Sequence, residues 1–459
     1  MAGDSTLNLK SLHLPKLSRE LPQEWCWSRL DDLCVGIYDC PHSTPQLVDR
    51  GPLIARSQDI ITGVFRSKQA AQVSEETYRE RTLKAVPTHG DLLYSREGTY
   101  FGIAAEVPEH TRVCLGQRMV LIRPRTDILN FRYLRYWLNS PVVAAHVRGF
   151  RDGTVAERLN LPTIRALPVA LPPLTEQRAI AHILGTLDDK IELNRRMSET
   201  LEAMARALFK SWFVDFEPVR AKLEGRWRRG ESRPGLRAHL YDLFPDRLVA
   251  SELGEIPEGW EVGTLADVAS LNPEVWSKQT RPPKINYIDL SNTKWGRIEA
   301  VTVHDAADAP SRAQRVLRPG DTIVGTVRPG NGSYAFISDD GLTGSTGFAV
   351  LRPVTTEHAE FVYLAATTSD NIDALAHLAD GGAYPAVRPE VVAATPIVRP
   401  GYDVLVEFSR TVRSLLTRIA LHECESRTLA ALRDALLPKL ISGQLRVKDP
   451  TCILGTADR

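Results

Sequence analysis

Side chains that can recognise nucleic acid occur in the predicted loops of both halves of the chain. Arginine, glutamine and asparagine can pair with base edges through two hydrogen bonds, and lysine and hydroxyl groups can hold phosphates. We take as candidates for such contacts Arg56, Gln58, Arg96, Tyr100 and Arg118 in the first half, and Lys294, Arg297, Arg328, Asn331, Tyr334, Tyr384 and Arg388 in the second. Each alone could equally be an ordinary surface residue. The occurrence of Arg96 and Arg328 at what the repeat predicts to be equivalent places favours a base-reading role for this pair.

Catalytic motifs, by contrast, are absent from the sequence. It contains no GxxxxGK[ST], GxSxG, HExxH or paired CxxC pattern. Asn272-Pro273-Glu274 lacks the second proline and the aromatic residue of the amino-methyltransferase motif. The glycine-rich stretch from Gly325 to Tyr334 lies between two apolar runs, which predicts a hairpin rather than the strand-to-helix turn of a phosphate site. We therefore expect no catalytic residue, no metal site and no cofactor in this chain, which would make it a non-enzyme.

The segments that must position these loops occur twice in the sequence. Leu21-Pro22-Gln23-Glu24-Trp25 returns as Ile256-Pro257-Glu258-Gly259-Trp260, and Gly90-Asp91 and Arg123-Pro124 return as Gly320-Asp321 and Arg352-Pro353. The offset between the copies stays between 228 and 235 residues along the chain. A period this long exceeds the roughly 20–50 residues of solenoid repeats, so whole domains are repeated.

Each half begins with a region of short strands and few helices. Residues 53–56, 91–95 and 119–123 read as strands and 131–139 as a helix, and the second half repeats this order with strands at 287–290, 321–324 and 347–351 and a helix at 360–368. Short strands mixed with a few helices predict an α/β or α+β fold for both globular domains.

Each half ends in a long amphipathic helix. Apolar residues recur every three or four positions in both helices, and the stripe is expected to include Ile180, Leu187, Leu201, Leu208, Trp212, Phe408, Leu415, Leu429 and Leu436, with Met197, Met204 and Leu432 alongside. Thr175 is a plausible N-cap, Pro438 should kink the second helix or begin a new turn, and Gly443 should end it. Helices of about 38 residues are roughly 57 Å long and must bury their stripes. Two in one chain can pair with each other in antiparallel fashion, which gives an internal pseudo-two-fold repeat. Asn194 and His422 are polar residues of these stripes that either tune the register or fix that pairing.

Composition narrows the class of protein further. The chain has 459 residues, 43% hydrophobic and 25% charged, with a net charge of +1, which is typical of globular proteins of two to four domains. No apolar run reaches membrane-spanning length, so no membrane partner is expected, and six cysteines without a framework spacing indicate a cytoplasmic protein. The basic stretch from Glu217 to Arg247 is either a solvated linker or a contact for phosphates or an acidic partner.

Three stretches carry a resemblance to a known family. The runs 171–180 and 211–218 resemble the central region of type I restriction-modification specificity subunits, and 436–445 resembles their C-terminal region. The second half departs from the pattern, because Arg399-Pro400-Gly401-Tyr402 replaces Pro-Pro-Leu and no Glu-Gln pair follows.

The resemblance implies a DNA sequence-specificity subunit without catalytic residues. Each target recognition domain would read one half of a bipartite, asymmetric site, and the two helices would set the spacing and dock two methyltransferase subunits. Restriction/motor subunits would join that core, double-stranded DNA is the expected target, and S-adenosylmethionine is expected on the partner methyltransferase. The corresponding division of the chain is an N-terminal tail (1–19), a first target recognition domain (20–172), a central spacer helix (173–216), a basic linker (217–255), a second target recognition domain (256–401), a C-terminal spacer helix (402–446) and a tail (447–459). The alternative is a non-catalytic coiled-coil scaffold with two protein-binding domains.

Overall fold

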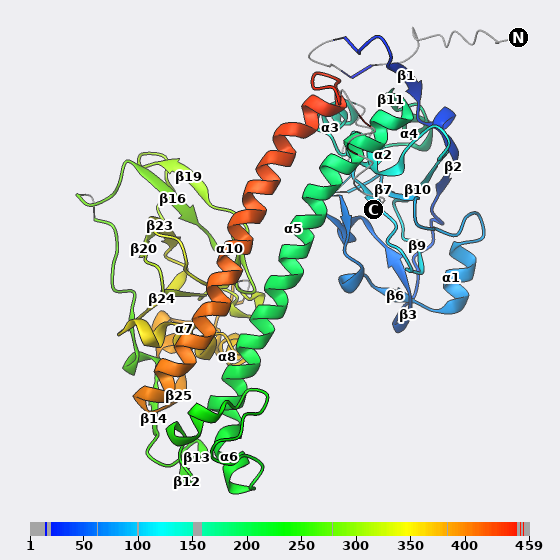
Figure 1. Ribbon diagram of the computed structural model, residues 1–459. Helices are drawn as coiled ribbons and strands as arrows, with labels where there is room; N and C mark the ends of the chain where they lie inside the picture. The colour runs from blue at the N-terminus through cyan, green and yellow to red at the C-terminus, as the bar shows by residue number, and fades with distance from the viewer. Residues whose placement is uncertain are drawn as a thin grey trace, which may run out of the picture. The chain divides into compact units, whose positions relative to one another are not determined.

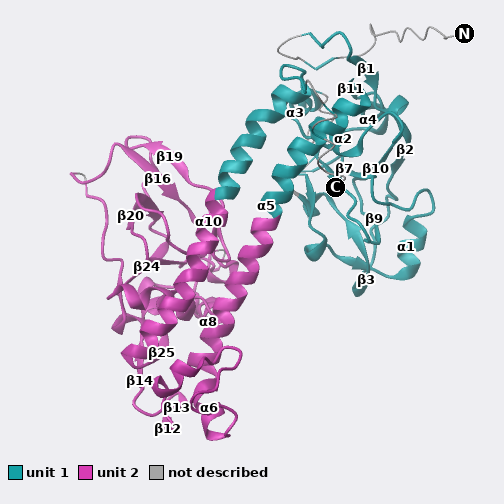
Figure 2. Ribbon diagram, viewed as in Figure 1, with its two compact units in different colours: residues 1–192, 425–459 teal, residues 193–424 magenta. Residues whose placement is uncertain are grey.

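The structure, a computed structural model, divides into two compact units. It describes residues 14–15, 20–61, 63–98, 101–149, 158–277, 279–382, 384–447, 450 and 453. Unit 1 comprises Met1–Glu192 and Glu425–Arg459, and unit 2 comprises Leu193–Cys424 (Figure 2). Each unit combines short strands and helices with parts of two long helices (Figure 1). Within the described ranges, no helix is long and apolar enough to cross a membrane.

Unit 1 is built around an antiparallel sheet with strand order β2-β10-β7-β8. A second sheet places β3 between β6 and β9 and pairs β3 with β9 in parallel, while β1 pairs with β11. Their bounds are β1 (Cys26–Arg29), β2 (Cys34–Asp39), β3 (Leu47–Ala55), β6 (Gln72–Val73), β7 (Leu92–Ser95), β8 (Ala104–Glu106), β9 (Val113–Leu115), β10 (Met119–Pro124) and β11 (Pro168–Leu171); β4 (Ile60–Ile61) and β5 (Val64–Phe65) form a small ladder. The helices are α1 (Glu75–Arg81), α2 (Phe131–Leu138), α3 (Pro141–Arg148), α4 (Leu161–Arg165) and the long α5 (Leu174–Phe209).

Unit 2 repeats the topology of the antiparallel sheet, but its second sheet has four strands, in the order β19-β16-β23-β20, where that of unit 1 has three. Its antiparallel sheet has the order β15-β24-β21-β22, a parallel pair joins β16 to β23, and β14 pairs with β25. The strands are β14 (Glu261–Thr264), β15 (Ala269–Leu271), β16 (Lys284–Ile288), β17 (Thr293–Lys294), β18 (Arg297–Ile298), β19 (Thr302–Asp305), β20 (Ala313–Leu317), β21 (Thr322–Gly325), β22 (Tyr334–Phe336), β23 (Leu342–Ser345), β24 (Phe348–Pro353) and β25 (Pro396–Arg399). The helices α7 (Ala359–Ala366), α8 (Ser369–Leu378), α9 (Pro389–Ala393) and α10 (Tyr402–Ile441) follow in the same order as α2 to α5. The predicted fold class, with an internal repeat and two long helices, is confirmed.

A buried ion pair explains why the Gly-Asp and Arg-Pro dipeptides occur twice. In unit 1 the carboxylate of Asp91 accepts hydrogen bonds from Arg123, with Nε 2.8 Å away. In unit 2 Asp321 accepts from Arg352 Nε at 2.9 Å. Both aspartates also accept a bond from the main-chain N–H three residues earlier, and both follow a glycine of positive φ. The repeated dipeptides thus join equivalent turns to equivalent sheet strands.

Within unit 1, the first part of α5 and the last part of α10 run antiparallel. Asp188 pairs with Arg433 at 2.8 Å, and two residues further along α5, Lys190 pairs with Glu425 at 3.4 Å. The residue number rises on one helix as it falls on the other. The predicted antiparallel pairing is therefore present in this unit.

Within unit 2, the remaining parts of the same two helices also pair antiparallel. Phe209 contacts Phe408 with ring centroids 6.1 Å apart. The amide of Asn194 donates to the main-chain oxygen of His422 at 3.5 Å, and the hydroxyl of Ser198 lies 3.4 Å from the His422 ring. Asn194 and His422 are equivalent residues of the two copies, so their contact favours the interpretation that they fix the pairing.

The predicted helix stripe is partly correct. Ile180, Trp212 and Phe408 are buried, whereas a half-buried position is found for Leu187, Leu201, Leu208, Leu415, Leu429 and Leu436. Met197, Met204 and Leu432 were expected on the stripe, and they are exposed instead. The residues that follow the two methionines in sequence, Ser198 and Ala205, are buried instead. Their small side chains let the two helices approach closely. The helix ends also differ slightly from expectation: α5 begins at Leu174, so Thr175 lies inside its first turn, and α10 continues through Pro438. Gly443 follows the end of α10 with a φ of 71°, as predicted.

The Glu-Gln pair at the start of α5 connects this helix to the rest of unit 1. The Gln177 amide is fully buried, accepts from the main-chain N–H of Asn130 at 2.9 Å and donates to two main-chain carbonyls. The buried Glu176 carboxylate accepts from the Trp25 indole at 3.0 Å and from Arg446 at 2.7 Å. These bonds account for the junction motif of the first half.

The stretch predicted as a basic linker folds onto the core of unit 2. It contains α6 (Glu217–Leu223), a short 3-10 helix (Ala238–Leu243) and the hairpin of β12 (Leu248–Ser251) and β13 (Gly254–Pro257). Trp227 and Phe244 are buried in the same cluster as Trp212. Several of its arginines pair with local carboxylates, among them Arg226 with Glu217 and Glu224, Arg229 with Asp242 and Arg247 with Glu258. This segment is packed and largely neutralised, in contrast to a solvated linker.

Candidate nucleic-acid interface

The loop between β21 and β22 forms the centre of the candidate surface in unit 2. The two strands form the predicted hairpin, with Thr322 opposite Phe336. Between them Arg328 and Gly332 both have positive φ and flank a short 3-10 turn, Pro329–Asn331. This turn packs against α8. The loop therefore has a defined backbone rather than a free one.

A neighbouring segment holds the other side of this loop. The Arg328 N–H donates to the Pro385 oxygen at 2.7 Å, and the Val387 N–H donates to the Thr326 oxygen at 2.9 Å. The exposed Arg328 guanidinium lies over the ring of Tyr384, 4.6 Å from its centroid. Tyr384 is 71% exposed. An arginine and an aromatic ring are thus presented together to solvent.

The hairpin of β17 and β18 contributes a further aromatic residue, Trp295, that was not among the predicted candidates. Trp295 is 57% exposed and has a φ of 48°, and Gly296 follows it with a φ of 85°. Two consecutive residues of positive φ are the signature of a tight two-residue hairpin turn. The ring covers Gly332 so closely that a Cβ there would lie 2.5 Å from it. The Trp-Gly dipeptide between two basic residues was the sequence signal for this turn.

The other candidates of unit 2 occupy different environments. Asn331 and Arg388 are exposed, and Lys294 is half-buried. Arg297 lies 3.6 Å from the Glu199 carboxylate of α5, which ties it to that helix. These positions bring Arg328, Asn331 and Tyr384 close to one another through the shared loop frame.

Tyr334 is a core residue rather than a surface one. Its side chain is only 6% exposed, and its hydroxyl accepts a hydrogen bond from Arg206 at 3.3 Å. Burial raises the pKa of its phenol, so the hydroxyl stays protonated. The expected surface position is therefore wrong, because the first residue of β22 points its side chain inward.

The described ends of the corresponding loop in unit 1 follow a similar backbone with different side chains. The Leu159 N–H donates to the Arg96 oxygen at 2.8 Å, the counterpart of the bond made by the Thr326 oxygen. Gly98 and Gly102 have φ values of 96° and 77°. The equivalent of Arg328 is therefore Gly98, and the predicted equivalence of Arg96 and Arg328 is wrong by two residues. The two arginines have the same side chain but occupy different positions along the backbone of the two loops.

The predicted candidates of unit 1 are mostly engaged in ion pairs. Arg56 donates to the buried carboxylate of Asp59 through Nε at 2.9 Å and Nη2 at 3.1 Å. Arg96 lies 3.4 Å from Asp39, and the more exposed Arg118 lies 3.3 Å from Glu97. Gln58 is exposed, and Tyr100 lies outside the described residues. Arg118 and Gln58 are the candidates here with the most accessible side chains.

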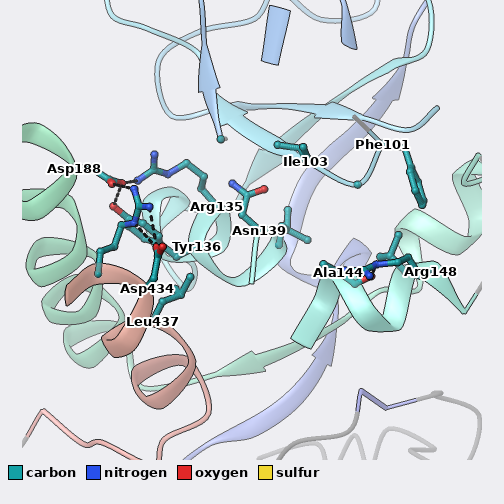
Figure 3. Close-up of a pocket in the computed structure, with 15 residues that line it drawn as sticks. Phe101, Ile103, Arg135, Tyr136, Asn139, Ala144, Arg148, Asp188, Asp434 and Leu437 are labelled. Carbon is teal, nitrogen blue, oxygen red and sulfur yellow. Dashed lines mark hydrogen bonds and ion pairs between the residues drawn. The ribbon is translucent and has the colours of Figure 1, made fainter. Parts of the chain in front are cut away.

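A cavity of about 510 Å³ lies in unit 1 beside α2, α3 and the helix pair (Figure 3). Its polar side consists of a network around Asp188, which accepts bonds from Tyr136 at 2.5 Å, Arg135 at 3.1 Å and Arg433 at 2.8 Å. Burial raises the pKa of the Tyr136 phenol. Because these charged groups bind one another, the network fastens α2 to the long helices and does not form a site for chemistry. Among the described residues, no cluster of acidic, histidine or cysteine side chains could hold a metal ion.

Comparison with known proteins agrees with the resemblance found in the sequence. Residues 56–203 match the model of the type I restriction modification DNA specificity domain. The chain is 24% identical to the Type I restriction enzyme HindI specificity subunit of Haemophilus influenzae over 78% of its own length and 86% of that protein. It is 23% identical to the Type I restriction enzyme MjaIX specificity subunit of Methanocaldococcus jannaschii, with 84% of each chain covered. A crystal structure of the type I restriction-modification S subunit from M. genitalium shares the fold, with a TM-score of 0.54 and 15% identity over 93% of this chain and 98% of that one.

The shared fold consists of two α/β domains of similar topology, each continuing into one helix of an antiparallel pair. The chain is similar over most of its length to specificity subunits of type I restriction-modification systems, and residues 56–203 match their DNA specificity domain. The resemblance found in the sequence is thereby confirmed, and the family's members are named as specificity subunits rather than as the catalytic chains.

Proposed function

We propose that each α/β domain reads one half of a bipartite, asymmetric DNA site, and that the paired helices set the distance between the halves. We also propose that the helices dock two methyltransferase subunits, which would hold S-adenosylmethionine, and that restriction/motor subunits join this core. The chain itself contributes recognition and spacing.

One observation carries this proposal: the ends of the loop after β7 and of the loop after β21 have similar backbone conformations and contacts but different side chains. The frame between the two residues of positive φ begins at Gly98 in one copy and at Arg328 in the other. A loop with a similar backbone and different side chains suits two domains that recognise different DNA sequences. Because the copies are not identical, a target without palindromic symmetry follows.

The long helices offer apolar surface for a partner. In unit 2, Leu193, Met197 and Met204 of α5 are 50%, 37% and 54% exposed, and Leu421 of α10 is 56% exposed. Exposed leucine and methionine side chains on a regular helix favour helix-to-helix association. This supports the docking of methyltransferase subunits along the helices.

Exchange of one domain tests the reading of half-sites. Residues 20–172 would be replaced by the corresponding residues of another specificity subunit of known target, and methylated sites would be mapped at base resolution. We expect one half of the target to change to that of the donor, while the other half and the gap stay as they were. A change in both halves, or in neither, would contradict the proposal. Binding of a protein ligand without any DNA binding would favour the scaffold alternative.

A further inference from the structure

Trp295 differs from the other tryptophans of the chain in its exposure. The sequence contains eight tryptophans, and the structure describes all of them. Trp27 and Trp276 are half-buried, whereas the side chains of five others are buried, namely Trp25, Trp137, Trp212, Trp227 and Trp260. Trp295 is 57% exposed. An aromatic ring of this size gains free energy when its apolar surface is covered, so its position is a candidate contact for a ligand.

The indole ring of Trp295 is held by the loop that follows β21. The Trp295 N–H donates to the Gly332 oxygen at 2.6 Å, and the Gly296 N–H donates to the Tyr334 oxygen at 3.0 Å. A Cβ at Gly332 would lie 2.5–2.7 Å from the ring atoms Cδ2, Cε3 and Cε2. Because Cδ2 is bonded to three other ring atoms, it can be approached this closely only from above the ring plane. The backbone of Gly332 therefore covers one face of the indole, and the exposure of the side chain comes from the other.

A buried neighbour fixes the orientation of the ring further. The Tyr334 ring meets the indole at 87°, with the centroids 6.1 Å apart, which is an edge-to-face arrangement. Tyr334 itself is bonded to Arg206 through its hydroxyl. The open face of Trp295 is thus presented by a ring whose position is set by the fold.

The first domain has the same hairpin with a different residue before the turn glycine. β4 and β5 pair as β17 and β18 do, and a short 3-10 helix precedes both hairpins. Gly63 and Gly296 have φ values of 81° and 85°. In the sequence, the residue before the glycine is Thr62 in the first copy and Trp295 in the second. The hairpin therefore does not depend on an aromatic residue at this place, which favours a role for Trp295 that is particular to the second domain.

The geometry favours one kind of contact with DNA. Insertion between stacked base pairs needs access to both faces of a ring, and Gly332 occupies one face of Trp295. A single open face suits a methyl group. In the major groove the base edge with such an apolar group is that of thymine, through its C5-methyl. Since the ring packs on the loop at the centre of the candidate surface, it extends that surface, which favours DNA over a protein partner.

We infer that Trp295 is a specificity-determining residue of the second domain and contacts the C5-methyl group of a thymine in the half-site that this domain reads. The inference rests on the proposed function. The open face of the indole covers the methyl group. Because Gly332 and Tyr334 already hold the ring, little conformational freedom is lost on binding.

The test compares thymine with deoxyuridine, which lacks only the methyl group. The full chain in complex with its methyltransferase first selects duplexes from a pool of random sequence, and exchange of residues 20–172 shows which half-site belongs to the second domain. Each thymine of that half-site is then replaced by deoxyuridine, one at a time. For wild type we expect one replacement to weaken binding about 4-fold, the value for one buried methyl group. At that position Trp295→Ala should bind both duplexes with equal affinity, and Trp295→Phe should retain part of the difference.

Two controls accompany this comparison. Each protein is compared with itself on two duplexes, so a general loss of affinity in a variant does not imitate the expected result. Tyr402→Ala removes another exposed aromatic ring of unit 2 and should leave the thymine preference unchanged. Acrylamide quenching of tryptophan fluorescence gives a second readout. The part of the quenching that Trp295→Phe lacks should decrease when the selected duplex is added.

Three outcomes would overturn the inference. The first is a half-site in which no thymine methyl group contributes to the affinity of wild type. The second is an equal thymine preference in wild type and Trp295→Ala, which would assign the methyl contact to another residue. The third is protection of Trp295 from acrylamide by the methyltransferase alone, with no further change on DNA, which would place the ring in a protein interface. In each case the proposed function stands if the complex selects a split motif, whereas a wild-type complex that selects no sequence would refute both.

Discussion

Lengthening both long helices by one turn should widen the gap in the DNA target without changing either half-site. α5 passes from unit 1 to unit 2 after Glu192, and α10 passes back after Cys424. Four helix-forming residues inserted at both places extend both helices equally. The contacts inside each unit, including that of Asn194 with His422, stay intact.

The size of the effect follows from helix geometry. Four residues add about 6 Å and about 400° of rotation, or about 40° beyond a full turn. In B-DNA one base pair corresponds to about 3.4 Å and about 35° of twist. The added length thus matches about two base pairs and the added rotation about one. We expect the gap to grow by one or two base pairs.

Base-resolution mapping of methylated sites in cells that express the lengthened chain is the assay. A two-residue insertion at both places serves as the control, because it rotates each stripe by about 200° and faces it away from its partner. That control should lose specific methylation. An unchanged gap in the four-residue variant, or a change in the bases of either half-site, would refute the role of the helices as a spacer.

Three further substitutions test contacts of the fold. Glu176→Gln should lower the free energy of unfolding by about 1.5–3 kcal/mol, because the buried carboxylate loses charge-assisted bonds; urea denaturation would measure this, and a value near zero would contradict it. Arg123→Met leaves the carboxylate of Asp91 buried without its cation and should cost about 3–5 kcal/mol by the same assay, so a neutral effect would show that the pair is dispensable. Tyr334→Phe removes only a buried hydroxyl bonded to Arg206 and should leave DNA selectivity as in wild type; an altered target would mean that this residue reaches DNA.

Much of the architecture could be predicted because the repeat preserves interactions that depend on particular residues. A buried aspartate needs its arginine, so the dipeptides around Asp91 and Arg123 survived in both copies and revealed the duplication. The long helices were visible from the spacing of their apolar residues. Their exact seam was not, because Ser198 and Ala205 pack closely without being strongly apolar, whereas the neighbouring methionines are exposed.

The reading surface was harder to predict from side-chain types. Arg96 and Arg328 look equivalent as arginines, but the backbone frame makes Gly98 the counterpart of Arg328. Tyrosine is a residue type that can recognise bases, but Tyr334 lies in the core. Which side chain faces solvent depends on the alternation along β22 and on the packing of the loop against α8, and neither is encoded in residue type alone.

The central claim is that two domains recognise two half-sites at a distance set by the paired helices. Determining the DNA sequence that is recognised tests this claim most directly. Base-resolution methylation mapping in cells carrying this chain and its methyltransferase should reveal a split motif, with two different half-sites separated by a gap of constant length and unspecified sequence. A single continuous motif, or a palindrome, would contradict the account.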